Sequence, residues 1–229
     1  MSVADFRQPP RALRGTPAEC LLPAGTRLYR IHDKKWASTA FNSRVQDPHF
    51  EGTRFDGTRE DPYAYYYGAL EMKTALAEAL LRSQPFEPSR RMRLLPIKSY
   101  AGRTASAVLL NRPLRLISLV SAEDLSAVGQ TNWLLRSEEY DKTRLWAHWL
   151  RREVPWAQGL LWLSNHDFPD GRALVLFGDR CQPEGVGAIL RPDPGLRSID
   201  FDDPTGLDWL EDRMLPLRTS VRRRAPLVI

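Results

Sequence analysis

The sequence has 229 residues, few cysteines and no long apolar run. Its two cysteines, Cys20 and Cys181, are too few for a disulfide framework and lack C-x-x-C spacing, which favours a reducing compartment. The longest apolar runs, residues 159–163 and 173–177, are far shorter than the roughly 18 residues that span a bilayer. The first ten residues carry charges and prolines instead of an apolar segment, so no secretory signal is expected. These absences predict a cytoplasmic protein without a membrane span.

Motifs of several common enzyme classes are also missing. The sequence contains no G-x-G-x-x-G after a strand, no G-x-x-x-x-G-K-[ST], no G-x-S-x-G and no H-E-x-x-H. These absences argue against Rossmann dehydrogenases, P-loop NTPases, common esterases and zincins. The four histidines lack the i, i+3 or i+4 spacing of metal ligands, so no metal site is expected. They are His32, His49, His148 and His166.

What the sequence has in excess is positive charge. It contains 33 Lys and Arg against 28 Asp and Glu, a formal net charge of +5, and most of the cations are arginines. The planar guanidinium can bind a phosphate or a carboxylate through two parallel hydrogen bonds. The composition therefore favours an anionic partner, without choosing between nucleic acid and a phosphate-bearing small molecule.

The sequence predicts one domain over residues 1–229. Hydrophobic residues make up 42% and charged residues 27%, which is typical of globular proteins. A core over about residues 26–180 is preceded by an irregular, proline-containing leader, 1–25, and followed by an extension, 181–229. Residues 33–61 are too polar for a core and too long for an ordinary connection, so they are a candidate ligand platform.

Hydrophobic periodicity predicts a mixture of strands and helices that neither alternate strictly nor segregate. This order favours an α+β domain with a mixed sheet and packed helices. Strands are expected at residues 26–32, 63–67, 94–99, 104–110, 114–119, 159–164, 172–178 and 187–190. Helices are expected from Met72 to before Pro85, after a cap at Ser121 and Asp124, and over about 137–153 and 207–215.

Four local patterns follow one another along the chain. They are Leu28-Tyr29-Arg30 in the first strand, Gly52-Thr53-Arg54-Phe55-Asp56 in the polar loop, Tyr67 followed by Thr74-Ala75-Leu76-Ala77-Glu78, and Leu161-Trp162-Leu163-Ser164 before a turn. In this order and spacing they resemble the RES domain, a bacterial family named for its arginine, glutamate and serine. The resemblance extends from about Leu28 to Phe177 and includes residues 140–150, which are similar to the family's tyrosine- and alanine-rich helix.

The resemblance implies an enzyme that degrades NAD⁺ and has a fold similar to that of the ADP-ribosyltransferases. It also implies a toxin restrained by an Xre-type helix-turn-helix antitoxin protein. Oligomeric state stays open, a homo-oligomer included. The family's arginines match Arg30 and Arg54, its tyrosine Tyr67, its acid Glu78 and its serine Ser164, and Tyr29 joins them as a substrate-binding residue. The stretch from Arg54 to Tyr67 is longer than is usual in the family, which leaves Tyr65 and Tyr66 as alternatives to Tyr67.

The chemistry of such a site can be argued from the residue types. Breaking the nicotinamide–ribose bond builds positive charge on the sugar, which a nearby carboxylate such as Glu78 stabilises. Arg30 and Arg54 suit the pyrophosphate or an attacking phosphate, and the Tyr67 ring can stack on the cationic nicotinamide. Ser164 can hydrogen-bond the ribose, the carboxamide or the nucleophile. NAD⁺ is then a substrate rather than a cofactor, and inorganic phosphate is the expected co-substrate, while water or a protein stays open as the acceptor.

Each of these residues also has an ordinary structural explanation. Glu78 lies about 130° from the centre of its helix's apolar stripe and could form a solvated pair with Arg82.

Two other functions stay open: an ADP-ribosyltransferase acting on a protein, and a nucleic-acid-binding protein that uses the clusters 89–93 and 222–224. Short arginine runs are usually solvated surface, so direct binding of nucleic acid is the less favoured of the two.

Overall fold

The computed structural model describes residues 6–223, and its elements follow the chain in this order. The strands are β1 (Glu19–Leu22), β2 (Arg27–Asp33), β3 (Tyr65–Ala69), β4 (Arg93–Leu95), β5 (Arg103–Leu110), β6 (Leu114–Leu119), β7 (Gly159–Leu163), β8 (Arg172–Phe177), β9 (Leu190–Pro192), β10 (Ile199–Asp200) and β11 (Thr219–Val221). The helices are α1 (Met72–Leu80), α2 (Ile97–Tyr100), α3 (Ala122–Ala127), α4 (Trp133–Arg136), α5 (Tyr140–Glu153), α6 (Gly178–Cys181), α7 (Pro204–Met214) and the 3-10 helix η1 (Leu215–Leu217).

Within the described residues, one mixed sheet of nine strands organises the molecule. Its order is β1-β6-β7-β8-β3-β2-β5-β10, with β9 also paired to β5. Only β6 and β7 run parallel in it. A separate parallel pair joins β4 to β11, which lie far apart in the sequence. The α+β prediction with a mixed sheet is therefore confirmed.

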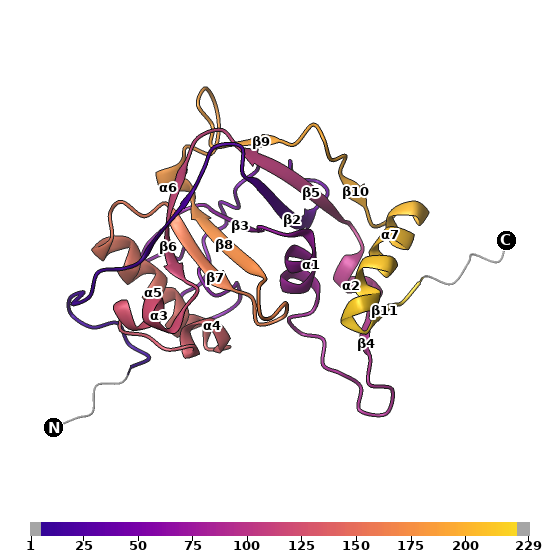
Figure 1. The fold of residues 1–229 in the computed structure, drawn as a ribbon, viewed down its shortest axis with the longest axis horizontal. Coiled ribbons are helices and arrows are strands. Elements are labelled where there is room, and N and C mark those ends of the chain that lie inside the picture. The colour runs from indigo at the N-terminus through magenta and orange to yellow at the C-terminus, as the bar shows by residue number, and fades with distance from the viewer. Residues whose placement is uncertain (1–5, 224–229) are drawn as a thin grey trace.

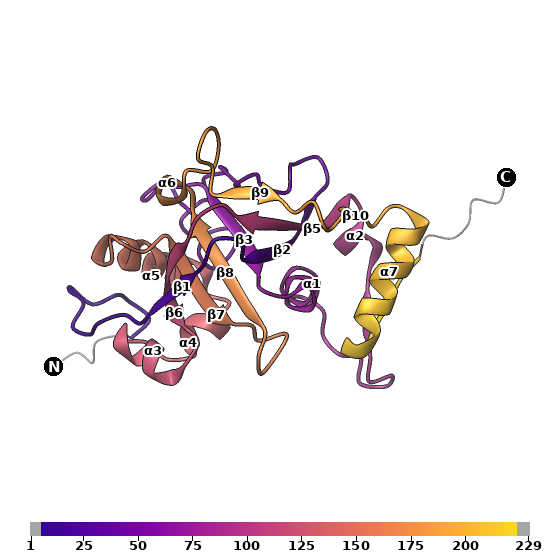
Figure 2. The same cartoon turned by 45° about the horizontal axis from the view of Figure 1, so that its top comes forward.

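Helices cover one face of this sheet in two groups, which Figure 1 and Figure 2 show on either side of the central strands. Helices α3, α4 and α5 pack over β6, β7 and β8 around Trp146 and Trp149. Helix α1 packs against β2 and β3, and α7 packs against β10 and β11, in a cluster that includes Leu76, Leu80 and Leu210. A third apolar cluster fills the opposite face and is built almost entirely from strand side chains, which the curled sheet brings together.

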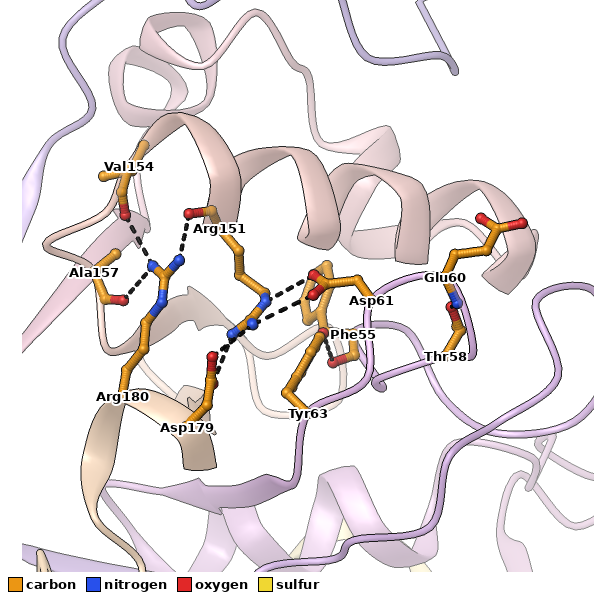
Figure 3. Close-up of polar contacts among 10 residues, drawn as sticks. All are labelled: Phe55, Thr58, Glu60, Asp61, Tyr63, Arg151, Val154, Ala157, Asp179 and Arg180. Atoms are coloured by element: carbon orange, nitrogen blue, oxygen red, sulfur yellow. Dashed lines mark hydrogen bonds and ion pairs between the residues drawn. The ribbon is translucent and has the colours of Figure 1, made fainter.

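The long polar loop between β2 and β3 is held in place by two arginines of α5. Arg144 is 1% exposed and donates to the carbonyls of residues 47, 50, 51 and 53. Arg151 forms ion pairs with Asp61 and Asp179, each at 2.9 Å, and its guanidinium lies 3.8 Å from the centre of the Tyr63 ring (Figure 3). Because side chains of a rigid helix supply these contacts, the loop is a fixed platform.

Most predicted elements are present, with three corrections. The leader is not irregular throughout, because Glu19–Leu22 pairs with β6 as an edge strand. The strand predicted over 94–99 ends at Leu95, because Pro96 has no amide hydrogen for a ladder and precedes the short helix α2. The strand predicted over 187–190 begins only at Leu190, after a turn in which Gly185 and Gly187 adopt positive φ. Among residues 6–223, every helix falls short of the length and apolar character needed to cross a membrane.

Candidate active site

A cleft of about 850 Å³ lies on the helix-covered face of the sheet, beside α1. Four of the six predicted site residues contribute atoms to its lining. They are Tyr29, Arg30, Tyr67 and Glu78. Arg54 and Ser164 lie outside the lining and are described below. The polar loop also reaches the cleft through Thr53, which supports its role as a platform.

Glu78 projects from α1 into the cleft. Its helix buries Ala75, Leu76 and Leu80 against the sheet, and Glu78 lies on the border of that apolar stripe, with 18% of its side chain exposed. Arg82, one turn further along the chain, places its Nη2 at 3.6 Å from the Glu78 carboxylate. The predicted pair therefore forms, but it lies inside the cleft and is not fully solvated.

Two arginines gather around this carboxylate. The guanidinium of Arg54 lies 5.6 Å from the centre of the Tyr140 ring, and that of Arg82 lies 5.8 Å from the same centre. Burial lowers the pKa of Arg54. Burial also opposes the charge of Arg82, but the fields of Tyr140 and Glu78 outweigh it and raise the pKa of this guanidinium. Both side chains are cations at neutral pH, so the neighbourhood of Glu78 carries a surplus of positive charge.

The position of Arg54 follows from the connection between α4 and α5. Its Nη1 donates to the carbonyl of Leu134 at 3.0 Å and to that of Ser137 at 2.6 Å. The Thr143 hydroxyl donates to the Arg54 carbonyl at 2.9 Å. Arg54 is thus fixed at both its backbone and its side chain, close to the cleft wall.

Tyr67 is oriented by the motif in the polar loop. Its hydroxyl donates to Asp56 Oδ1 at 2.9 Å and accepts from the Phe55 amide at 2.9 Å. Burial, followed by the negative field of Asp56, raises the pKa of Tyr67 well above its ordinary value. Gly52 has φ of 72°, and a Cβ there would approach Asp56 Oδ2 to 2.8 Å, so glycine is required at this position. The ring is therefore held rigidly, and its hydroxyl is protonated.

The structure distinguishes the three consecutive tyrosines. Of these, only Tyr67 lines the cleft. The Tyr65 hydroxyl accepts hydrogen bonds from Asn42 and Gln46, and Tyr66 is buried in the cluster on the opposite face. This alternation is the ordinary period of two in a strand.

Arg30 borders the cleft, but its guanidinium points to the other face of the sheet. Alternation along β2 sends Arg30 to the side opposite Tyr29 and Ile31. Its guanidinium lies 4.3 Å from the centre of the Tyr66 ring, and Nη1 donates to the Ala40 carbonyl at 2.6 Å. Burial lowers the pKa of Arg30. In this conformation the charged end of Arg30 is separated from Glu78 by the sheet.

Ser164 directly follows β7 and lines a smaller neighbouring pocket of about 290 Å³. It is 1% exposed, and its Oγ accepts from the His166 amide at 3.1 Å. Asp167, three residues after Ser164, accepts from the Thr74 hydroxyl of α1 at 2.7 Å, and Lys73 Nζ lies 2.6 Å from its other oxygen. The turn that carries Ser164 is thereby fastened to the helix that carries Glu78.

Several cleft residues were not identified from the sequence. Trp162 is 4% exposed and lines the cleft, and the centre of its ring lies 6.4 Å from that of the Tyr67 ring. Arg82 was considered only as a surface partner of Glu78. Lys98 and Arg103 lie beyond the quoted patterns, and no motif marks them. Their side chains add positive charge to the lining.

The arginine clusters that suggested nucleic-acid binding are largely occupied within the molecule. Arg93 lies 3.8 Å from the centre of the Phe86 ring and donates to the Gln84 carbonyl. Arg90 faces Glu87 at 3.7 Å, and Arg223 forms ion pairs with Asp208 and Glu211. Arg224, the end of the second cluster, lies outside the described residues. Residues 6–223 contain no group of three or more His, Cys, Asp or Glu side chains placed to hold a metal ion.

Two of the comparisons with known proteins give matches. The family model of the RES domain matches residues 27–196. The fold is similar to that of the MbcT toxin in the crystal structure of the M. tuberculosis MbcT–MbcA toxin–antitoxin complex, with a TM-score of 0.54 and 14% sequence identity over 79% of this chain and 86% of that chain. No curated protein matches the sequence significantly.

Proposed function

The chain belongs to the RES domain family, and from this premise we propose that it degrades NAD⁺ by cleaving the bond between nicotinamide and ribose. The observation that carries the proposal is the single carboxylate of Glu78, held inside a cleft next to an aromatic ring and between cations. A ligand that combines a cationic ring with anionic phosphates matches this distribution of charge.

In the proposed mechanism Glu78 stabilises the positive charge that develops on the ribose as the glycosidic bond breaks. The Tyr67 ring stacks on nicotinamide, and its bonded hydroxyl keeps the ring in one orientation. The electron pair of the breaking bond stays on the nicotinamide nitrogen, which leaves as a neutral molecule. No strong general acid is therefore required.

We further propose that inorganic phosphate is the acceptor. A phosphate oxygen forms the new bond to the ribose carbon while the bond to nicotinamide breaks, giving nicotinamide and ADP-ribose-1''-phosphate. Arg54 and Arg82 support this proposal, since two guanidinium groups beside one carboxylate leave a net positive charge for an attacking anion. Ser164, at the end of β7, is proposed to hydrogen-bond the ribose or the nucleophile.

Nicotinamide release from NAD⁺ by the purified protein, with and without inorganic phosphate, tests the reaction. Glu78→Gln should retain the fold and lose activity by about 1,000-fold, since removing one transition-state contact costs 100- to 1,000-fold or more. Glu71→Gln is the matched control, because Glu71 precedes the same helix, is exposed and makes no capping bond. Release that requires phosphate indicates a phosphorylase, and release without it indicates a glycohydrolase. Wild-type activity in Glu78→Gln contradicts the site assignment.

The acceptor could instead be a protein. Labelled ADP-ribose that accumulates on a macromolecule, rather than as a small phosphorylated product, would identify an ADP-ribosyltransferase. Arg54→Ala should raise the KM for substrate as well as lower kcat, because it removes a positive charge beside the cleft that attracts the anionic ligand.

We also propose that the protein is a cytoplasmic toxin restrained by an antitoxin of the Xre helix-turn-helix type. The family membership and the fold shared with MbcT support this biological role. The antitoxin would act by covering the cleft at Glu78. Growth arrest on expression of the wild-type chain, relieved by Glu78→Gln or by co-expression of a neighbouring helix-turn-helix gene, is the expected result. Undisturbed growth with active enzyme would contradict it.

A further inference from the structure

The cleft is elongated and crosses several strands. In the order of the sheet, its lining includes Trp162 of β7, Ala173 of β8, Tyr67 of β3, Ile31 of β2 and Arg103 of β5. Since neighbouring strands lie about 4.8 Å apart, these five strands span about 19 Å. Trp162 lies at the β7 end, and Tyr67 lies on β3, the central strand of the five. A ligand that reacts there has room to extend to β5.

The β5 end of the cleft carries two cations. Lys98 projects from α2 and is exposed, while Arg103 is the first residue of β5 and is half-buried. Arg103 Nη1 donates to the Ala79 carbonyl of α1 at 3.3 Å, which leaves most of the guanidinium hydrogens for other partners. Burial lowers the pKa of Arg103, so its charge is held partly away from water.

Within residues 6–223, neither Lys98 nor Arg103 has a carboxylate at ion-pair distance. Asp33 is opposite Arg103 in the β2–β5 register, but its carboxylate lies 2.9 Å from Lys35 Nζ. Glu78 faces Arg82 instead. Asp33 attracts Arg103 from beyond ion-pair distance, so within residues 6–223 neither cation has a carboxylate in direct contact. A ligand phosphate would supply that contact.

We propose that Lys98 and Arg103 form a phosphate subsite that holds the pyrophosphate of NAD⁺ while its nicotinamide riboside end lies at Glu78 and Tyr67. The planar fork of Arg103 binds two phosphoryl oxygens, and Lys98 adds a mobile point charge at the rim. This inference rests on the proposed function for the identity of the substrate. It assigns the pyrophosphate to residues outside the family's arginine positions, one of which, Arg30, has its guanidinium on the opposite face.

The subsite is tested by calorimetric binding of ADP-ribose, which contains the pyrophosphate but no bond to nicotinamide. A charge-assisted hydrogen bond is worth about 1.5–3 kcal/mol, so Arg103→Gln should weaken binding by about 10- to 100-fold. Lys98→Gln should weaken binding by a smaller factor, about 3- to 10-fold, because solvent screens an exposed charge. Arg103→Lys should fall between wild type and Arg103→Gln.

The matched control is Arg90→Gln, which removes the same charge from an exposed side chain that faces Glu87 outside the cleft. It should bind ADP-ribose like the wild type. If Arg103→Gln does not fold because α1 loses the contact at Ala79, the ADP-ribose affinity of Lys98→Gln alone decides the test. Wild-type affinity in folded Lys98→Gln and Arg103→Gln overturns the proposal.

Two substrates separate the pyrophosphate from inorganic phosphate as the occupant. Turnover of nicotinamide riboside, which has no phosphate, should be unaffected by Lys98→Gln, while the KM for NAD⁺ should rise. If the variants instead raise the inorganic phosphate concentration needed for half-maximal rate and leave ADP-ribose affinity unchanged, the proposal is wrong and the subsite belongs to the acceptor. Binding of ADP-ribose remains measurable if no nicotinamide is released, so failure of the proposed function is distinguished from failure of the subsite.

Discussion

Two arginine-rich regions of the molecule differ in how their positive charges are balanced. Around Arg151, charges are matched: Asp61 and Asp179 both pair with its guanidinium, and Arg180 donates to the carbonyls at the end of α5 (Figure 3). Around Glu78, cations outnumber carboxylates. Matched charge fixes a loop, whereas unmatched charge in a cleft prepares it for an anionic ligand. Both regions contain several arginines. What distinguishes the structural region from the candidate site is whether carboxylates pair with those arginines.

The largest effect on stability is expected in the matched region. Arg151→Met removes two ion pairs and the stacking on Tyr63, and should lower the free energy of unfolding by about 3 kcal/mol, since loss of one partner of a buried pair is strongly destabilising. The neighbouring Arg152 has 66% of its side chain exposed, so Arg152→Met should cost less than about 0.5 kcal/mol. Urea unfolding measures both variants. Equal effects would show that the Arg151 cluster is no more structural than ordinary surface charge.

A smaller effect is expected when a proton is added to His32, which lies on β2 on the same face of the sheet as Arg30, the face opposite that of Glu78. Burial and then the charge of Arg30 lower the pKa of His32 to about 4. The unfolded chain, with a histidine pKa of about 6.5, binds more protons between these values, so stability should fall by about 2 kcal/mol as pH drops from about 6.5 to 4. Urea unfolding at several pH values should show a shallower slope in His32→Gln. An identical slope in the variant would assign the pH dependence to other groups.

The smallest effect on stability is expected for Glu78→Gln, even though this variant should lose the most activity. Its ion pair with Arg82 spans one helical turn, and such pairs contribute about 0.5 kcal/mol or less. Thermal and urea unfolding should therefore be almost unchanged. A loss above about 2 kcal/mol would mean that Glu78 is a structural residue like Arg151, and the contrast between the two regions would disappear.

Short sequence patterns predicted the elements that are determined by residues close together in the chain. Ser121 and Asp124 form the expected capping box, and the apolar run at 159–163 is a strand buried on both faces. The spacing of Glu78, about 130° from the centre of the apolar stripe, predicted a solvated residue, whereas the structure places it in the cleft with 18% of its side chain exposed. The strand expected through Pro96 was wrong, because the missing amide hydrogen at this position outweighed the apolar character of its neighbours.

The remaining parts of the site depend on contacts that sequence spacing does not specify. Alternation put Tyr65 and Tyr67 on one face and Tyr66 on the other, but it could not say which face forms the cleft. Whether Arg30 points into the cleft also depends on which face of the sheet forms it. Arg103 reaches the cleft only because β5 pairs with β2, in which its register partner Asp33 lies 70 residues earlier in the chain. The pairing of distant strands depends on the whole fold. No short sequence pattern around Arg30 or Arg103 therefore shows where the side chain points.

The packing of α1 also determines when a newly made chain can complete its cleft. Phe201, Leu210, Met214 and Val221 belong to the cluster that buries Leu76 and Leu80 of this helix. Chains fold from the N-terminus during synthesis, so the helix bearing Glu78 emerges from the ribosome well before its covering segment does. Until residues 199–221 have been translated, its apolar face lacks that cover. Assembly of the site is therefore a late event in the synthesis of the protein.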